Sequence, residues 1–331
     1  MARRMTYVEA IREALAEEME RDDRVFFMGQ DVGRYGGLFG QSAGLQERFG
    51  KRRVFDTPIS ETFIVGGGVG AAITGLRPVV ELQFADFVAV AMDEIYNKAA
   101  KWRYMHGGLF TVPMVILTPE GAMGGAGPEH SQCPESLFLS APGLYVLTPT
   151  TPADAKGLLK SAIRSDNPVL FLWHKALVNS VGDVPDGDDT IPIGQADIRR
   201  EGSEVTVIAW SNMVPRALEA ADLLAAEGVS VEVIDPRGVR PLDVNTILDS
   251  VRKTGRVVLV HEAAKAGGPG AEVAAIIAEQ AVDSLEAPIK RIGVPDVPIP
   301  QSMYLEKLVV PDVSDIVVTV NSIVPTAKVT S

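Results

Sequence analysis

Glu61 is the residue whose setting in the sequence best suits acid–base chemistry. It follows a short apolar segment, Val54–Phe55, and Pro58, which lacks the N–H that a strand needs and so ends it. Ser60 is of a type that commonly caps a helix, and the stretch Thr62–Gly75 is apolar on every side of a helix. We expect that helix to be buried and Glu61, in its first turn, to be partly desolvated. Alternatively, Glu61 is an ordinary acidic residue that the helix dipole favours in a first turn. The catalytic interpretation of Glu61 therefore needs support from a second functional group.

His130 is the second candidate for acid–base chemistry. It follows Gly121–Gly127, a glycine-rich loop that can bring backbone close to a ligand. A surface loop histidine is the alternative. His174, at the end of an apolar segment, is either functional or a buried structural histidine. Cys133 could act with His130 as a nucleophile pair, but no orienting group is apparent, and free cysteines usually pack in a core.

Apolar segments typical of strands alternate with helical patterns through the first half of the chain. This order indicates an α/β fold with a mostly parallel sheet covered on both faces. Thr6 and Glu9 form a capping-box pattern at the first helix. The glycines of the helix after Glu61 lower helix propensity and indicate that another backbone packs close. The expected strands are 24–29, 54–55, 77–84, 112–117, 144–147 and 169–172, and the expected helices are 7–19, 43–49, 61–75, 91–104 and 152–164.

The region after residue 178 interrupts this alternation, because it is rich in Gly, Pro and Asp and has no helical period. We therefore predict a first α/β domain at 1–178, a linker at 179–200 and a smaller α/β domain at 201–331. Strands are expected in the second domain at 205–209, 231–234, 257–260 and 290–293, with helices at 214–226, 244–252 and 271–281.

Ligands of open parallel sheets bind beyond the carboxyl ends of the strands. Four segments of the first domain reach that edge, and they bring Glu61 and His130 toward one place: 59–61, 83–87, 121–130 and 173–175. The run Gly66–Gly70 has the wrong glycine spacing for a dinucleotide fingerprint. Gly267–Gly270 could hold an anion before a helix, although an ordinary loop is the preferred interpretation.

Composition excludes several classes of protein. The 331 residues carry a net charge of −12 without a basic stripe, which argues against a nucleic acid partner and against anionic membrane surfaces. No apolar run reaches the length of a membrane span. Cys133 is the single cysteine and the four histidines are spread out, so neither a disulfide framework nor a metal-ligand cluster is expected. A cytoplasmic location is expected, with a mitochondrial origin after processing as the alternative.

Several motifs in register resemble the β subunit of thiamine-diphosphate-dependent 2-oxo acid dehydrogenases, the decarboxylating component of the pyruvate, branched-chain and acetoin dehydrogenase complexes. The similarity covers nearly the whole chain and implies a pyrimidine-binding α/β domain followed by a transketolase-type C-terminal domain. The motifs are Asp-Thr-Pro-Ile-Ser-Glu at 56–61, the segment 75–87, Asn-Lys-Ala-Ala-Lys at 97–101, Arg-Tyr-Met at 103–105, Gly-Pro-Glu-His-Ser-Gln at 127–132 and Asp-Pro-Arg at 235–237.

The resemblance assigns roles to individual residues. Glu61 matches the glutamate that hydrogen-bonds a ring nitrogen of the aminopyrimidine and promotes the imino tautomer. Ile59, Gln83 and Phe87 match positions that line the aminopyrimidine pocket, where Phe87 would stack on the ring. His130 matches the histidine at the substrate end, which would orient the substrate, the proton traffic or the incoming lipoyl group.

The resemblance also implies partners. Family members are usually α2β2 heterotetramers in which the α subunit holds the diphosphate and magnesium, and a lipoyl-bearing acyltransferase accepts the acyl group. Some members hold potassium on backbone carbonyls, which here would be those of Met114, Ala162, Ile163, Ser165 and Asn167.

Two positions depart from the family pattern: Leu117 replaces a common arginine, and Trp173 replaces a common glutamate. We expect both residues near the cofactor edge or a chain interface. They would therefore affect which substrate and which partner subunit the chain binds.

The sequence thus predicts a β subunit that, with an α subunit, decarboxylates a 2-oxo acid such as pyruvate and reductively acylates a lipoyl domain. An acetoin dehydrogenase β subunit and a catalytically silent structural subunit are the alternatives. Selectivity between small apolar substrates rests on about 1–3 kcal/mol, so the sequence does not name the acid.

Overall fold

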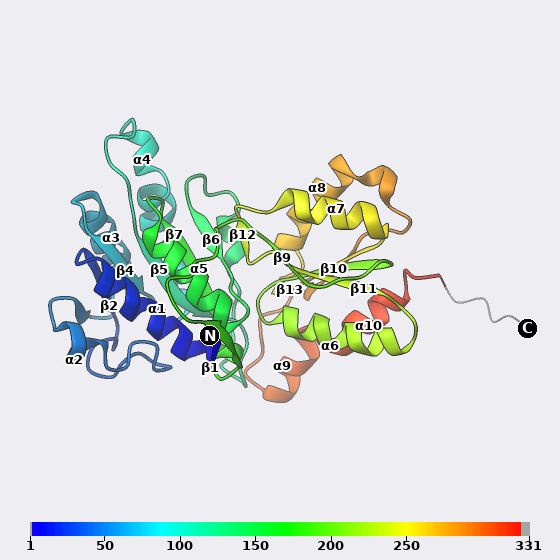
Figure 1. Cartoon of the computed structure of the whole chain (residues 1–331), viewed down its shortest axis with the longest axis horizontal. Coiled ribbons are helices and arrows are strands. Elements are labelled where there is room, and N and C mark those ends of the chain that lie inside the picture. Colours follow the sequence, from blue (N-terminus) through cyan, green and yellow to red (C-terminus); the bar gives the residue numbers. More distant parts are fainter. Residues whose placement is uncertain (1, 326–331) are drawn as a thin grey trace, which may run out of the picture. The chain divides into compact units, whose positions relative to one another are not determined.

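The computed structural model describes residues 2–325 and divides the chain into two compact units (Figure 1). The first unit comprises residues 1–123 and 129–193, and the second comprises 124–128 and 194–331. The segment Gly124–Pro128, which leads to His130, therefore packs with the second unit although the residues on either side of it belong to the first.

The first unit contains a parallel sheet whose strands lie in the order β6-β7-β5-β4-β2-β3. Their carboxyl ends share one edge, as the sequence predicted. The elements are β1 (Ala2–Thr6), α1 (Tyr7–Arg21), β2 (Val25–Gly29), α2 (Leu45–Phe49), β3 (Val54–Asp56), α3 (Glu61–Ile73), β4 (Arg77–Glu81), η1 (Ala85–Ala89), η2 (Glu94–Ala99), α4 (Trp102–Met105), β5 (Val115–Glu120), η3 (Glu135–Phe138), β6 (Tyr145–Leu147), α5 (Pro152–Arg164), β7 (Val169–His174), η4 (Lys175–Leu177) and β8 (Val181–Pro185).

Alternate residues of the strands pack on opposite faces of this sheet, as the two-residue period of a strand requires. Phe27, Val79 and Leu117 join the core under α1 and α5, which lie side by side on one face (Figure 1). Val80, the neighbour of Val79, faces the other side, where α3 packs. Both faces of the sheet are therefore covered, which confirms the expected α/β layering.

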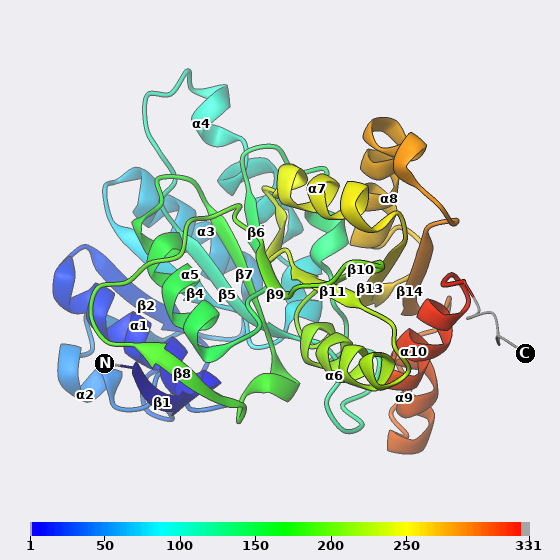
Figure 2. The same cartoon turned by 45° about the vertical axis from the view of Figure 1, so that its right-hand side comes forward.

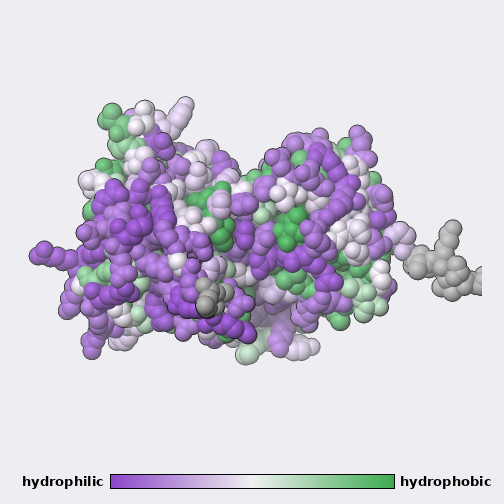
Figure 3. All heavy atoms as spheres, viewed as in Figure 1, coloured by the Kyte–Doolittle hydropathy of each residue, from purple (hydrophilic) through white to green (hydrophobic). Residues whose placement is uncertain are grey.

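Helix α1 begins where the sequence predicted. Thr6 Oγ1 accepts from the backbone N–H of Glu9, and a carboxylate oxygen of Glu9 accepts from the backbone N–H of Thr6 at 2.8 Å. Thr151 and Asp154 form the same reciprocal cap at α5, whose bounds the sequence also predicted. The face of the molecule that carries α1 and α5 is covered mainly by hydrophilic side chains (Figure 3).

The expectation that α3 is buried on every side is wrong for this chain. Ile64, Val65 and Val69 are buried against the sheet, whereas Phe63 on the opposite side is 57% exposed. A helix that is apolar all round covers its second face only if another surface packs on it. Within the described chain both the sheet and the segment that carries η2 pack on α3, and the face that carries Phe63 stays open.

The single helix expected at 91–104 is also wrong. The structure has the π-type helix η2 there and then the four-residue α4, while η1 lies before this segment. The strand expected at 112–117 instead starts at Val115 and extends to Glu120. In the segment expected to be a linker, β8 pairs with the unpredicted β1 in an antiparallel ribbon.

The second unit holds a sheet in the order β14-β13-β10-β11-β9, parallel except for β9. Strand β10 matches its predicted bounds, whereas the C-terminal helices α9 and α10 were not predicted. Turned by 45°, the chain shows α7 and α8 on one face of this sheet and α6 and α10 on the other (Figure 2). The elements are β9 (Asp197–Arg200), β10 (Val205–Ala209), α6 (Met213–Ala226), β11 (Val231–Asp235), β12 (Gly238–Arg240), α7 (Val244–Thr254), β13 (Val257–Ala264), α8 (Pro269–Gln280), η5 (Val282–Ser284), β14 (Lys290–Val294), α9 (Met303–Val309) and α10 (Val313–Asn321).

Among the described residues 2–325, the helices do not combine the length and the apolar character needed to cross a membrane.

Candidate functional site

Glu61 begins α3, as the sequence predicted, and only 8% of its surface is exposed. Gln30, which directly follows β2, is also buried and donates from Nε2 to Oε1 of Glu61 at 3.4 Å. Ser60 occupies the N-cap position, but its side chain makes no capping hydrogen bond. The Glu61 carboxylate therefore sits at the positive end of a helix with an amide as its side-chain partner, where it is held as a hydrogen-bond acceptor.

Contacts along α3 connect Glu61 to the segment that carries Phe87. Thr62 Oγ1 donates to the carbonyl oxygen of Val90 at 2.9 Å, just after η1. One turn later, a Cβ on Gly66 would lie 3.2 Å from Oε2 of Glu94, at the start of η2. The carboxylate and the aromatic ring of Phe87 thus stand on two elements that are bound to each other.

His130 lies among the aromatic side chains of the sheet edge. Its ring stands edge-on to Phe84, with ring centres 4.4 Å apart, and to Phe87 at 5.5 Å. Lys175, which follows β7, donates to the backbone carbonyl of His130. The Gln132 N–H donates to Asp86 of η1 at 3.2 Å, so the loop beyond His130 is held on the same edge. Three of the four predicted edge segments therefore meet at His130.

The loop before His130 requires its glycines. Gly121, Gly124, Gly125 and Gly127 all have positive φ, a conformation that costs other residues energy. Gly121 has a packing reason as well, because a Cβ there would lie 1.8 Å from Nε2 of His174. The sequence predicted a glycine-rich loop here, and the structure has neither helix nor strand at 121–130.

The other residues expected to line the aminopyrimidine pocket are more exposed to solvent. Ile59 is 81% exposed, and Gln83 and Phe87 are partly exposed. The structure thus groups Glu61 with Gln30, and His130 with Phe84 and Phe87, and presents Ile59 at the surface. Gln30 was missed as a candidate, although it follows a strand of the same sheet and the rule on strand ends applies to it. Lys175 belongs to the predicted edge segment 173–175 but was given no role.

The surroundings of His174 and Cys133, the other titratable candidates, indicate structural roles. His174 is fully buried, and its Nδ1 accepts from the backbone N–H of Ala176 at 3.1 Å. The Sγ of Cys133 and carboxylate oxygens of Glu120 and Glu135 all lie within 4.8 Å of one another. Neighbouring carboxylates disfavour a thiolate, which argues against Cys133 as a nucleophile. The sequence did not predict this cluster, because its members come from separate segments.

The glycine run at 267–270 packs around a histidine. A Cβ on Gly268 would lie 2.3 Å from the ring of His261, and one on Gly270 would lie 3.0 Å from it. Burial lowers the pKa of His261 to about 4, so the ring is neutral at pH 7. These contacts give Gly268 and Gly270 a packing role around His261.

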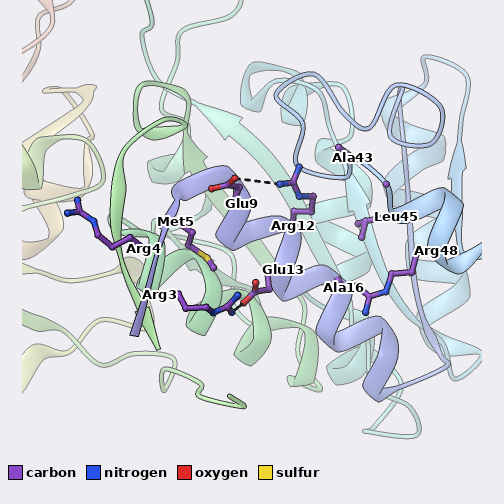
Figure 4. Close-up of a pocket in the computed structure, with 11 residues that line it drawn as sticks. Arg3, Arg4, Met5, Glu9, Arg12, Glu13, Ala16, Ala43, Leu45 and Arg48 are labelled. Atoms are coloured by element: carbon purple, nitrogen blue, oxygen red, sulfur yellow. Dashed lines mark hydrogen bonds and ion pairs between the residues drawn. The ribbon is translucent and has the colours of Figure 1, made fainter. Parts of the chain in front are cut away.

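A separate pocket of about 490 Å³ opens beside β1, α1 and the loop before α2 (Figure 4). Arginines and glutamates line it, and Arg3 pairs with Glu13 at 2.6 Å while Arg12 approaches Glu9 at 4.0 Å. None of the candidate site residues lines this pocket. Four arginines and two glutamates line it, and two of the arginines also pair outside the lining, Arg3 with Asp186 and Arg48 with Glu20.

Comparison with known proteins identifies the family. Residues 3–180 match the model of the transketolase pyrimidine binding domain, and residues 194–316 match that of the transketolase C-terminal domain. The chain is 48% identical over 305 residues to the 2-oxoisovalerate dehydrogenase subunit beta of Bacillus subtilis, covering 92% of this chain and 93% of that one. It is 47% identical over 320 residues to the mitochondrial pyruvate dehydrogenase E1 component subunit beta-2 of Oryza sativa, covering 96% and 85%.

The chain belongs to the E1 β-subunit family of 2-oxo acid dehydrogenases. This is a thiamine-diphosphate-dependent family with transketolase-like domains. A solved split-gene transketolase, titled an inactive β4 tetramer, resembles it with a TM-score of 0.80 at 25% identity, over 96% of this chain and 98% of that one. The family and the α/β fold expected from the sequence are thus confirmed.

The residues at the sheet edge fit the aminopyrimidine end of the family's cofactor. A buried carboxylate at a helix start can accept a hydrogen bond from a protonated ring nitrogen, and the partly exposed face of Phe87 can take a stacked ring. Glu61 and Phe87 stand on connected elements, so this chain can present both groups together.

The two departures from the E1 β pattern differ in position: Leu117 lies within β5, whereas Trp173 lies near the carboxyl end of β7, in the predicted edge segment 173–175. Leu117 is fully buried in the core beneath α1 and α5. Trp173 is also fully buried, and its ring stands edge-on to Phe39 with centres 5.3 Å apart. Large apolar side chains on the inner face of a sheet fill the core, so both side chains contribute to packing.

The carbonyls expected to hold potassium already accept hydrogen bonds in this chain. Ile163 and Ser165 both accept from Nη1 of Arg77 at 3.0 Å. The carbonyls of Met114, Ala162 and Asn167 accept from Val169 N–H, Ser165 N–H and Ser165 Oγ, respectively. Each carbonyl oxygen has a second lone pair, and a potassium ion would have to use those positions beside the Arg77 guanidinium.

Proposed function

We propose that this chain is the β subunit of an enzyme that decarboxylates a 2-oxo acid such as pyruvate on thiamine diphosphate and reductively acylates a lipoyl domain. The observation that carries the proposal is the buried Glu61 carboxylate at the start of α3, in a member of the E1 β family. The relatives reported above are named for pyruvate or 2-oxoisovalerate, which favours a 2-oxo acid over acetoin.

In this proposal the cofactor, when bound, supplies the electron sink for the carbanion that decarboxylation produces. Glu61 holds a proton at the aminopyrimidine ring nitrogen, and Gln30 keeps its carboxylate oriented through the 3.4 Å hydrogen bond. Phe87 stacks on the ring, while Ile59 and Gln83 line the same pocket. His130, held by Lys175 and by its aromatic neighbours, orients the substrate end.

The proposal needs a second chain. An α subunit would hold the diphosphate and magnesium and complete an α2β2 heterotetramer, and a lipoyl-bearing acyltransferase would take the acyl group. The exposure of Ile59 and Phe63 supports this, because both flank Glu61 and are left open by this chain. The split-gene transketolase titled as an inactive β4 tetramer suggests that this chain alone is likewise inactive.

We also propose the division of labour expected from the sequence, with pyrimidine binding in 1–178, a linker at 179–200, a transketolase-type domain in 201–331 and a cytoplasmic location. Potassium stays a proposal for Met114, Ala162, Ile163, Ser165 and Asn167. If it binds there, replacing potassium by sodium lowers the thermal stability of the assembled enzyme, and equal stability in both salts counts against it.

The deciding experiment assays decarboxylation of pyruvate and of branched-chain 2-oxo acids by this chain alone and with its α subunit, with thiamine diphosphate and magnesium present. We expect activity only with both chains. Glu61→Gln keeps the size of the side chain but removes the acid–base group, so we expect kcat to fall at least about 100-fold while assembly persists.

The matched control is Glu47→Gln, which changes an exposed glutamate on α2 and should leave kcat unchanged. Unchanged turnover by the Glu61 variant would remove the assignment of Glu61. The absence of activity and of cofactor binding in the assembled wild-type pair would instead favour a silent structural subunit.

A further inference from the structure

A buried glutamate far along the chain binds the loop that leads to His130. Glu306, on α9, is 8% exposed. Its Oε1 accepts from the backbone N–H of Gly124 at 3.0 Å, and its Oε2 accepts from that of Gly125 at 2.8 Å. Both carboxylate oxygens are thus used on two consecutive amides. Charge-assisted hydrogen bonds of this kind are roughly twice as strong as neutral ones.

The backbone of the loop is shaped for this contact. Gly124 and Gly125 have φ of +66° and +87°, so successive N–H groups turn toward one acceptor. A Cβ on Gly125 would lie 2.6 Å from the carbonyl oxygen of Gln301 and 3.0 Å from Cγ of Met303. The loop backbone therefore lies directly against the start of α9, with no room for a side chain.

The same loop is anchored again beyond Glu129. The carbonyl of His130 accepts from Lys175, its ring packs on Phe84, and the Gln132 carbonyl accepts from the Gly121 N–H at 3.1 Å. His130 lies five residues after Gly125, in a stretch with positive-φ glycines and without helix or strand. Ordering an irregular stretch of this kind costs conformational entropy, and the Glu306 contacts restrain its first end.

We propose that Glu306 is a positioning residue for His130, acting through the backbone of Gly124 and Gly125. This inference rests on the proposed function for the role of His130. Glu306 need not touch the substrate: its carboxylate restrains the loop, and the loop sets where the imidazole ring stands. A small displacement of a group at a reacting centre is enough to lower the rate.

The test is a double-mutant cycle on the full chain assembled with its α subunit. Glu306→Gln keeps the size of the side chain but places an NH2 group against a backbone N–H. We expect kcat for 2-oxo acid decarboxylation to fall about tenfold, with thiamine diphosphate affinity changed less than about twofold because Glu61 and Phe87 are untouched. Glu279→Gln, an exposed glutamate on α8, is the matched control and should change neither.

The cycle separates positioning from a general structural role. In a His130→Ala background, Glu306→Gln should lower kcat by no more than about twofold, because the group that it positions is already gone. An equal tenfold loss in both backgrounds would overturn the inference. If Glu306→Gln does not give folded chain, Gly125→Ala breaks the same contact from the loop side and should show the same dependence on His130.

Amide hydrogen exchange gives a readout that does not depend on activity. Glu306→Gln should speed exchange across residues 122–132 and leave α6 unchanged. Unchanged exchange across 122–132 would overturn the inference even if kcat fell. If the assembled wild-type pair does not decarboxylate any 2-oxo acid, the proposed function fails, and the exchange measurement alone decides whether Glu306 holds the loop.

Discussion

Glu81 is the carboxyl group whose ionisation burial affects most clearly. It ends β4, is 1% exposed, and both of its oxygens accept from Nε2 of Gln41 at 2.8 Å. Burial raises the pKa of Glu81 to about 8, and the hydrogen bond from Gln41 offsets only part of that rise. The folded chain therefore keeps Glu81 protonated at neutral pH.

This proton makes the stability of the chain depend on pH. The unfolded chain loses it near the ordinary pKa of 4.5, whereas the folded chain keeps it to about pH 8. Between these values the unfolding free energy should fall by about 1.4 kcal/mol per pH unit as pH rises, and then level off. Glu81→Gln should remove this contribution, which urea unfolding of both chains from pH 5 to 9 would measure. Parallel curves for the two chains would show that Glu81 ionises normally.

The sequence revealed residues of the candidate site where a local feature marks them. Glu61 and His130 were found because a helix start and a glycine-rich loop are local patterns. Gln30 was missed because its contact with Glu61 joins segments 31 residues apart and no motif marks it. Glu306 lies 181 residues from Gly125, so only the folded chain shows that they touch.

Two glycines of helix α3, Gly68 and Gly70, have different surroundings. A Cβ on Gly68 would lie 2.8 Å from Cγ1 of Val80 and 2.9 Å from Cε of Met114, whereas a Cβ on Gly70 would meet nothing within 4 Å. The close neighbours of Gly68 are the side chains of Val80 in β4 and of Met114 just before β5, rather than the backbone that the sequence led us to expect. The sheet therefore explains Gly68, and Gly70 faces the open side.

Two matched substitutions in α3 test this difference. Gly70→Ala should stabilise the isolated chain by about 0.5–1 kcal/mol, because alanine favours a helix and has room there. Gly68→Ala should destabilise it by about 1–3 kcal/mol, because Val80 and Met114 would have to move. Chemical unfolding of the two variants beside wild type measures both effects. A gain in stability from Gly68→Ala would contradict the packing described here.

Local sequence patterns predicted correctly those helices and strands whose ends depend on local interactions. Helix α5 and strand β10 have the bounds that the sequence indicates, since capping pairs and runs of β-branched residues define them. The helix expected at 91–104 instead breaks into η2 and α4. The pairing of β1 with β8 joins residues about 180 positions apart, which periodicity cannot reveal.

In the molecule as a whole, several large apolar side chains of the first unit are exposed to solvent. These residues cluster in sequence around the open face of α3 and the segment after it: Ile59, Phe63, Val90, Tyr104 and Leu109 are between 56% and 90% exposed. Covering large apolar side chains with another protein is favourable, because it removes apolar surface from water. We expect them to be covered by other subunits of the assembled enzyme.

Phe63→Asp tests that expectation. Phe63 is the third residue of α3, where an acidic side chain suits the helix dipole, so the variant chain should keep its own stability within about 0.5 kcal/mol. Sedimentation velocity of the chain mixed with its α subunit should nevertheless show a loss of the complex, because a carboxylate would be buried at the contact. Leu223→Asp, which changes a residue 52% exposed on α6 of the second unit, is the control and should assemble normally. If Phe63→Asp assembles as well as this control, the open face of α3 is not the surface that the partner covers, and the reason for its apolar composition must lie elsewhere.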